Sequence, residues 1–144
     1  MFKIFDKVEK KNLIELNIKG FIFNWSEISS ARAVTVSKIV NGEIAGLVEF
    51  ERQPENLCNH MWLIEVQENY QGTGIAGKLL AYVGRDSLEA GFEGFVVFET
   101  KTALYRYYQD KYGAKPLDGR RLFFDTIATK NLVDKYLGGS KDGE

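Results

Sequence analysis

A glycine-rich stretch between two apolar segments is the feature that most constrains this chain. Residues 71–78 read Gln-Gly-Thr-Gly-Ile-Ala-Gly-Lys; an apolar run at 61–66 precedes them and an amphipathic run covers 75–90. The first run is typical of a β-strand and the second of an α-helix. Because the N–H groups at a helix start lack partners within the helix and the helix dipole is positive there, the stretch predicts a phosphate or pyrophosphate site.

Three phosphate-binding patterns overlap in this stretch. Residues 72–77 fit G-x-G-x-x-G, and Glu99 follows at roughly the 20-residue distance that dinucleotide folds use. Residues 72–78 fit G-x-x-x-x-G-K, but Leu79 stands where a Mg²⁺-binding Ser or Thr is required. Residues 71–76 fit Q/R-x-x-G-x-G/A. Nucleotide folds place their glycine loop after the first strand of a parallel sheet, whereas a mostly antiparallel pattern precedes it here, so the context favours the third pattern.

The order of expected elements predicts an antiparallel meander, one βαβ unit around the glycine loop, then a helix and a late strand. At 144 residues the chain is expected to form one domain, spanning 1–144. Asn41-Gly42 is a strong hairpin signal. We expect strands at 13–18, 32–40, 44–52, 59–66, 94–99 and 122–127, and helices at 75–90, from a Thr102 cap to Gly113, and at 128–137.

Composition narrows the class of protein. The net charge of −1 gives no reason to expect nucleic-acid binding. Cys58, the single cysteine, excludes an internal disulfide framework. No apolar run reaches the roughly 20 residues of a membrane span, and the N-terminus lacks the apolar core of a signal peptide. We therefore expect a cytoplasmic protein that does not bind membranes; a homodimer is left open.

On residues 71–76 and on this order of elements, over roughly 34–127, the chain resembles the GNAT N-acetyltransferase superfamily. The resemblance implies a GNAT-like mixed α/β sheet, with acetyl-CoA as acetyl donor and no metal. In the family this loop binds the pyrophosphate of coenzyme A, and the strand before it binds pantetheine through its backbone. The cofactor-binding residues so implied are Ile64, Glu65, Val66, Gln71, Gly72, Thr73, Gly74, Ile75, Ala76, Gly77, Lys78 and Tyr108. For the side chains of Ile64 and Val66, core packing is the better expectation.

Two glutamates are candidates for the base that removes a proton from the acceptor amine. Glu99 ends the second strand of the βαβ unit, where the ribosomal-protein N-terminal acetyltransferases, which this segment resembles, have a catalytic glutamate. Glu65 is the rival because it interrupts an apolar strand near the pantetheine position. The alternative for Glu99 is a structural role, pairing with Lys101 or capping the next helix.

A tyrosine in the helix after Glu99 is the expected acid for the leaving thiolate. The family spacing Tyr-x-x-x-Gly falls on Gln109 here, so Tyr108 misses it by one residue. We favour Tyr108 and then Tyr105; the alternative is that these tyrosines only pack the amphipathic helix.

Cys58 and His60 are the single cysteine and single histidine of the chain. They cannot complete a metal site without further soft ligands, and none lie nearby in sequence. A Cys–His catalytic pair is also disfavoured, because residues two apart on a strand share a face but rarely meet in line.

The acceptor is less defined than the donor. Glutamates outnumber cations between residues 43 and 68, which predicts either an acidic rim for a small cationic amine or a peptide, or simply a solvated hairpin face. The superfamily usually has two helices between its first two strands, but only residues 24–33 lie between Phe23 and Val34, so no acceptor residues carry over from there.

The leading prediction is direct N-acetyl transfer to a primary amine. The alternatives are a non-catalytic acyl-CoA-binding regulatory module and, more weakly, a nucleotide-binding protein. The glutamates between residues 43 and 68 that make up the acidic pattern are Glu43, Glu49, Glu51, Glu55, Glu65 and Glu68.

Overall fold

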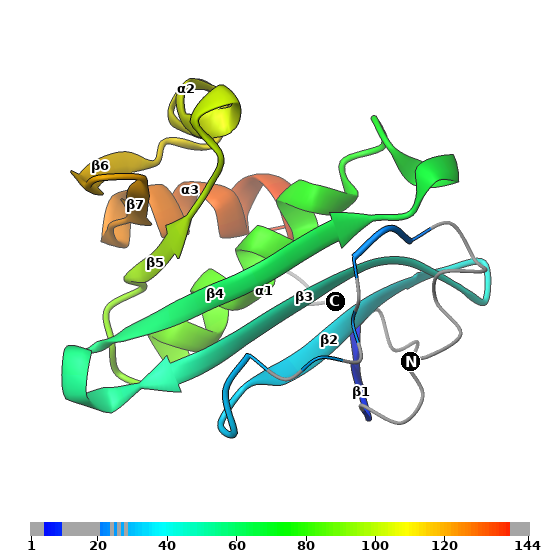
Figure 1. The fold of residues 1–144 in the computed structure, drawn as a ribbon, viewed down its shortest axis with the longest axis horizontal. Helices are drawn as coiled ribbons and strands as arrows, with labels where there is room; N and C mark the ends of the chain where they lie inside the picture. The colour runs from blue at the N-terminus through cyan, green and yellow to red at the C-terminus, as the bar shows by residue number, and fades with distance from the viewer. Residues whose placement is uncertain (1–4, 10–20, 24, 26, 28, 139–144) are drawn as a thin grey trace.

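One mixed β-sheet organises the molecule (Figure 1). The computed structural model describes residues 5–9, 21–23, 25, 27 and 29–138. Within these residues the strand order is β1-β2-β3-β4-β5-β7-β6, and β4 and β5 form the single parallel pair. The fold is thus the mixed α/β sheet that the sequence predicts. The strands are β1 Phe5–Val8, β2 Val34–Val40, β3 Glu43–Gln53, β4 Cys58–Val66, β5 Val96–Glu99, β6 Lys115–Asp118 and β7 Arg121–Phe124.

Local turn chemistry builds the antiparallel half of the sheet. Asn41 and Gly42 have φ values of 52° and 81°, which suit the two-residue type I′ turn between β2 and β3. A 3₁₀ turn at Pro54–Asn56 connects β3 to β4. The four strands β1 to β4 pair antiparallel in chain order. The predicted hairpin and meander are therefore confirmed.

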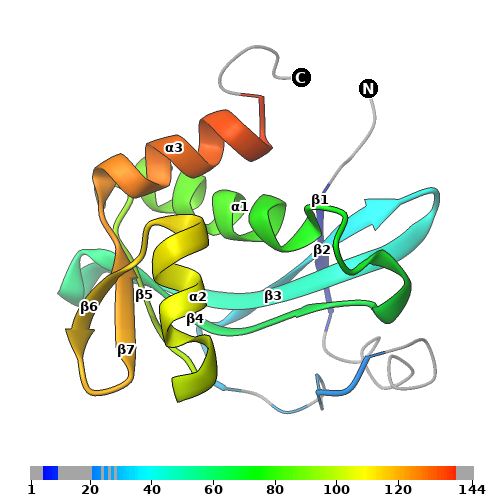
Figure 2. The same ribbon diagram turned by 90° about the horizontal axis from the view of Figure 1, so that it is seen from above.

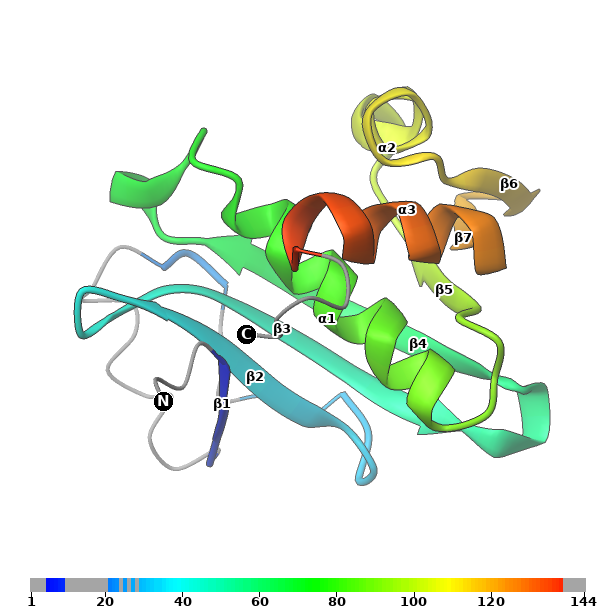
Figure 3. The same ribbon diagram turned by 180° about the vertical axis from the view of Figure 1, so that it is seen from behind.

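Helices α1 (Ile75–Glu89) and α3 (Thr126–Tyr136) cover one face of the sheet, as Figures 2 and 3 show. Helix α2 (Thr102–Tyr112) follows β5 and adds Tyr105, Tyr108 and Tyr112 to the main core. The two covering helices approach closely at Gly84, where an added Cβ would lie 2.7 Å from the Cγ2 methyl of Thr129. Helix α3 therefore packs directly on α1, the helix that connects β4 to β5.

The opposite face of the sheet is covered over β3 and β4 by described residues that precede β2 (Figure 2). Phe21 and Trp25 are buried there against Leu47 of β3. The Ser29 hydroxyl donates a hydrogen bond of 2.6 Å to Oε1 of Glu49, which anchors the same segment.

Several predicted boundaries were wrong or cannot be compared. The strand predicted at 13–18 lies outside the described residues, and β1 pairs with β2 through residues 5–8 instead. Thr102 is the first residue of α2 rather than its cap, which is Lys101. The short, exposed strand β6, which contains Pro116, was not predicted. Strand β7 stops at Phe124 because Asp125 caps α3, its Oδ1 accepting from the N–H of Ala128 at 2.9 Å.

None of the helices in the described part of the chain is long and apolar enough to cross a membrane.

Candidate functional site

Strands β4 and β5 pair over a short stretch and then separate (Figure 1). Their ladder ends at the pair Met61–Phe98. Directly beyond Met61 the ladder between β3 and β4 shifts register, which leaves Trp62 as an extra residue on β4. Such a β-bulge bends a strand and increases its twist. Within the described residues, the edge of β4 that faces β5 therefore has no partner strand beyond Met61.

A pocket of about 200 Å³ is lined by residues from both separating strands and from α2. β4 contributes Ile64, β5 contributes Glu99, and α2 contributes Tyr108. The sequence predictions assigned these three residues to one site, and the structure brings them around one pocket.

The glycine-rich loop connects the bent end of β4 to α1. Gly72 and Gly74 have φ values of 81° and 86°, a region that favours glycine. A Cβ on either residue would meet no atom within 4 Å, so their requirement for glycine is conformational and not a matter of packing. The Thr73 hydroxyl donates to the carbonyl of Tyr70 and holds the turn.

The start of α1 is open to an anion. Among the described residues no side chain accepts a hydrogen bond from its first turn, whose N-cap is Gly74. The backbone N–H groups of Ile75, Ala76 and Gly77 precede the first intrahelical hydrogen bond, which runs from Lys78 N–H to the Gly74 carbonyl at 3.2 Å. Three donors and the positive end of the helix dipole therefore converge at the end of the loop.

Other predicted cofactor residues have evident packing roles. Ile64 and Val66 pack against the main core. Ile75 is buried, and an added Cβ on Gly77 would lie 2.3 Å from the ring of Tyr136 in α3. Gly77 therefore allows close contact between α1 and α3, whether or not a ligand is bound. Gln71 is exposed beside the loop.

Glu99 ends β5 with its carboxylate half exposed at the pocket. Its Oε2 accepts a hydrogen bond of 3.0 Å from Nη2 of Arg120. The alternative prediction paired Glu99 with Lys101, but the ion pair found is with Arg120, and Lys101 lines the same pocket.

Tyr108 is the tyrosine of α2 that faces this pocket. Its ring packs edge-on against Phe98 with the ring centroids 5.1 Å apart. Burial raises the pKa of the Tyr108 hydroxyl above 10, and the neighbouring Tyr107 adds to the effect. The hydroxyl consequently keeps its proton through the neutral range. Tyr105 packs against the core without lining the pocket.

Glu65 holds the segment that covers the opposite face. Its carboxylate accepts from the backbone N–H of Ile22 at 2.5 Å and of Phe23 at 3.1 Å. It also accepts from the indole Nε1 of Trp25 at 2.9 Å. Three N–H donors give this carboxylate a structural role and favour Glu99 over it as the base.

Two of the three glutamates of β3, Glu49 and Glu51, belong neither to a solvated hairpin face nor to an acidic rim, whereas Glu43 is exposed at the start of the strand. Glu49 is fully buried and Glu51 is 2% exposed, since their side chains point under the segment before β2. Glu51 accepts hydrogen bonds from Arg32 at 2.9 Å and from the indole of Trp62 at 3.1 Å. The indole bond fixes the bulge residue at the point where β4 bends.

His60 is a site residue that sequence reasoning set aside. It lines a hollow of about 250 Å³ together with Glu99, Lys101 and Arg120. Its ring packs against that of Trp62, with the centroids 4.1 Å apart and the planes tilted by 38°, and burial lowers the pKa of the imidazole below 6.5. Alternation along β4 could have placed His60 on the same face as Glu99, but the bulge that brings Trp62 beside it has no sequence signal.

Within the described residues no group of three or more His, Cys, Asp or Glu side chains could hold a metal ion. Cys58 is buried, and burial raises the pKa of its thiol. These observations give no support to metal or thiolate chemistry at Cys58.

A mixed sheet with a separated parallel pair, a glycine loop and an open helix start defines an acyl-CoA-binding type of site. The family model described as acetyltransferase (GNAT) family matches residues 6–114. The chain belongs to this family. No curated protein matches the sequence at a significant level.

Solved structures share the fold at low sequence identity. An acetyltransferase of the GNAT family from Staphylococcus aureus is 17% identical, with a TM-score of 0.59 over 85% of this chain and 99% of that one. A candidate streptothricin acetyltransferase from Bacillus anthracis, solved with acetyl coenzyme A, is 14% identical, with a TM-score of 0.54 over 68% and 66%. A chain of the KacTA–DNA complex is 14% identical, with a TM-score of 0.59 over 91% and 89%. At these identities the likeness shows the fold alone, and the absence of nucleic-acid binding stays a prediction.

Proposed function

We propose that this protein transfers the acetyl group of acetyl-CoA directly to a primary amine. The observation that carries the proposal is the gap between β4 and β5, lined by a carboxylate (Glu99) and a phenol (Tyr108), beside an open helix N-terminus. Family membership and the acetyl-CoA complex of one structural neighbour support it.

The cofactor would bind by the loop and the unpaired strand edge. The N–H groups at the start of α1 would hold the pyrophosphate. Pantetheine would extend along β4 beyond Met61 as an added strand, since no strand of the described part of the chain pairs with that edge there. A backbone N–H in this region would polarise the thioester carbonyl.

The chemistry then requires a proton acceptor and a proton donor. The Glu99 carboxylate would accept a proton from the acceptor ammonium, directly or through water, because only the free amine is nucleophilic. The amine nitrogen would attack the thioester carbon, the carbon–sulfur bond would break, and the thiolate would take the hydroxyl proton of Tyr108. The second proton that the nitrogen loses as the amide forms would return through water to the Tyr108 phenolate, and Glu99 would release its proton to solvent. The raised pKa of Tyr108 keeps this proton in place until the thiolate forms.

Calorimetry with acetyl-CoA, and with NADH and ATP as controls, tests the cofactor. We expect micromolar binding of acetyl-CoA alone. Heat from a nucleotide but not from acetyl-CoA would show that the glycine loop binds something else. Release of free CoA thiol on addition of primary amines separates an enzyme from a regulatory module, which would bind acetyl-CoA without turnover.

A further inference from the structure

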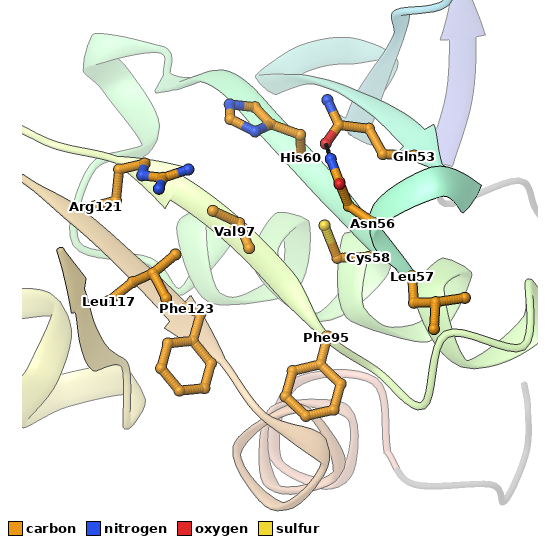
Figure 4. Close-up of a pocket in the computed structure, with 10 residues that line it drawn as sticks. All are labelled: Gln53, Asn56, Leu57, Cys58, His60, Phe95, Val97, Leu117, Arg121 and Phe123. Atoms are coloured by element: carbon orange, nitrogen blue, oxygen red, sulfur yellow. Dashed lines mark hydrogen bonds between the residues drawn. The ribbon is translucent and has the colours of Figure 1, made fainter.

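A second, larger hollow lies on the sheet face opposite α1, outside the gap between β4 and β5. Its volume is about 510 Å³, and Figure 4 shows its lining. Phe95, the residue before β5, and Phe123 of β7 lie side by side, with ring centroids 6.2 Å apart and rings nearly parallel. Val97 continues this apolar floor towards His60.

The rim of this hollow carries two exposed leucines. Leu57 is 65% exposed and Leu117 is 45% exposed. Leu57 also has a φ of 55°, a left-handed conformation that is uncommon for a leucine. Gln53, Asn56 and His60 add polar groups to the lining. Large apolar side chains combined with a few polar groups are typical of a binding site for a small molecule with an apolar part.

The hollow continues into the candidate catalytic site. His60 lines both this hollow and the smaller one that contains Glu99. That smaller hollow shares Met61, Trp62 and Glu99 with the pocket between the strands. Along β5, Val97 lies two residues before Glu99, or about 7 Å at the rise of a β-strand. This is the length of a short hydrocarbon arm.

We propose that this hollow, the apolar subsite, binds the apolar arm of the acceptor while the acceptor amine lies at Glu99. The inference rests on the proposed function and names its substrate class: primary amines with an aromatic or branched aliphatic arm. The one charged side chain in the lining, Arg121, is paired with Asp118 through two hydrogen bonds of 2.8 and 2.5 Å. A polyamine arm would therefore find an apolar floor and no carboxylate lining the subsite.

Steady-state kinetics with four amines test the subsite. The probes are 2-phenylethylamine and isopentylamine, which carry apolar arms, spermidine, which carries a charged arm, and methylamine, which has none. We expect kcat/KM for the two apolar amines to exceed that for spermidine by at least tenfold. Equal values for 2-phenylethylamine and spermidine would overturn the proposal.

Substitutions on the rim test whether this hollow determines the preference for amines with apolar arms. The double variant Leu57→Ser/Leu117→Ser should lower kcat/KM for 2-phenylethylamine about tenfold, the effect of one or two methylene groups in an apolar pocket. Methylamine turnover and acetyl-CoA affinity should not change. Ile127→Ser is the matched control, because Ile127 is 70% exposed on α3 and does not line the subsite.

The outcomes separate the two proposals. Failure of the wild type to bind acetyl-CoA, or to release thiol with any of the four amines, would overturn the proposed function and the subsite with it. Normal turnover with unchanged selectivity in the rim variant would overturn the subsite alone. A rim variant that converts a dimer to a monomer in sedimentation, with selectivity unchanged, would assign the hollow to a second copy of the chain.

Discussion

Met61 pairs with Phe98 at the last rung between β4 and β5, and the strands separate immediately beyond it. The separation coincides with the bulge at Trp62, whose indole donates to the buried carboxylate of Glu51 at 3.1 Å. Because a bulge bends its strand, the geometry of the candidate site is set by a backbone irregularity held by a side-chain hydrogen bond. The following predictions test the parts of this arrangement separately.

The glycine loop can be tested with two substitutions that cause equal backbone strain. Gly74 in the loop and Gly42 in the β2–β3 hairpin both have φ above 80°, and an added Cβ meets nothing within 4 Å at either. Gly74→Ala and Gly42→Ala should each lower the unfolding free energy by about 1–2 kcal/mol. Only Gly74→Ala should weaken acetyl-CoA binding, by tenfold or more in calorimetry. Equal affinities in the two variants would exclude the loop as the pyrophosphate site.

Gly77 should matter for stability through α3. An alanine there would place its Cβ 2.3 Å from the Tyr136 ring, so Gly77→Ala should cost about 1–3 kcal/mol in urea unfolding. Tyr136→Ala removes the clash, and the double variant should be less destabilised than the sum of the two single variants. Additive losses would show that the close contact between Gly77 and Tyr136 does not set the requirement for glycine.

Substitution of Glu99 should affect catalysis, whereas substitution of Glu65 should affect stability. Glu65→Gln leaves three N–H donors with a poorer acceptor and should lower the unfolding free energy by about 1–3 kcal/mol. Glu99→Gln breaks an exposed ion pair and should change stability by less than about 1 kcal/mol. Its kcat/KM for amine-dependent thiol release should fall about 10²–10⁴-fold, with acetyl-CoA affinity retained. The reverse pattern would make Glu65 the base.

Sequence patterns predicted the parts of the fold that depend on local chemistry. The Asn41-Gly42 turn, the alternation of β2 and the glycine loop before α1 each follow from the residues at those positions. Strand β6 was missed because its four residues are all exposed and include a proline, so no apolar alternation marks it. The end of β7 was placed too late because Asp125 reads equally well as a strand residue or as a helix cap.

Only part of the candidate site could be predicted from the sequence. Glu99 could be placed because it ends the second strand of the βαβ unit, and Tyr108 because the resemblance to the GNAT superfamily implies a tyrosine in the following helix, although the family spacing falls on Gln109. The roles of Glu49, Glu51 and Glu65 could not, because their partners come from the segment before β2, far away in sequence. The position of His60 beside Glu99 could be predicted only with knowledge of which strand lies beside β4 and in which register.

Tyr108 should act as the proton donor to the leaving thiolate. Tyr108→Phe should lower kcat by about 10²-fold while leaving acetyl-CoA affinity unchanged in calorimetry. Tyr105→Phe is the matched control, because Tyr105 lies on the same helix without lining the pocket. Since burial raises the pKa of Tyr108 above the ordinary value of 10, the midpoint of the loss of wild-type activity at alkaline pH should lie above pH 10. Equal kcat values in the two variants would mean that solvent, and not Tyr108, supplies the proton to the leaving thiolate.

His60 should make the wild-type protein less stable in mild acid. Burial lowers its pKa below the ordinary 6.5, the positive charge of Arg121 adds to this shift, and the negative charges of Glu51 and Glu99 do not reverse it. Below pH 6.5 the unfolded chain therefore binds more protons at this residue than the folded chain. Its contribution to stability is fully present above pH 6.5 and is lost as the pH falls towards the folded-state pKa. Urea unfolding followed by tryptophan fluorescence should show a larger drop between pH 7 and 5 for the wild type than for His60→Gln. Parallel pH profiles would mean that the imidazole is solvated in the folded state, with the other acid-sensitive groups common to both proteins accounting for the whole loss.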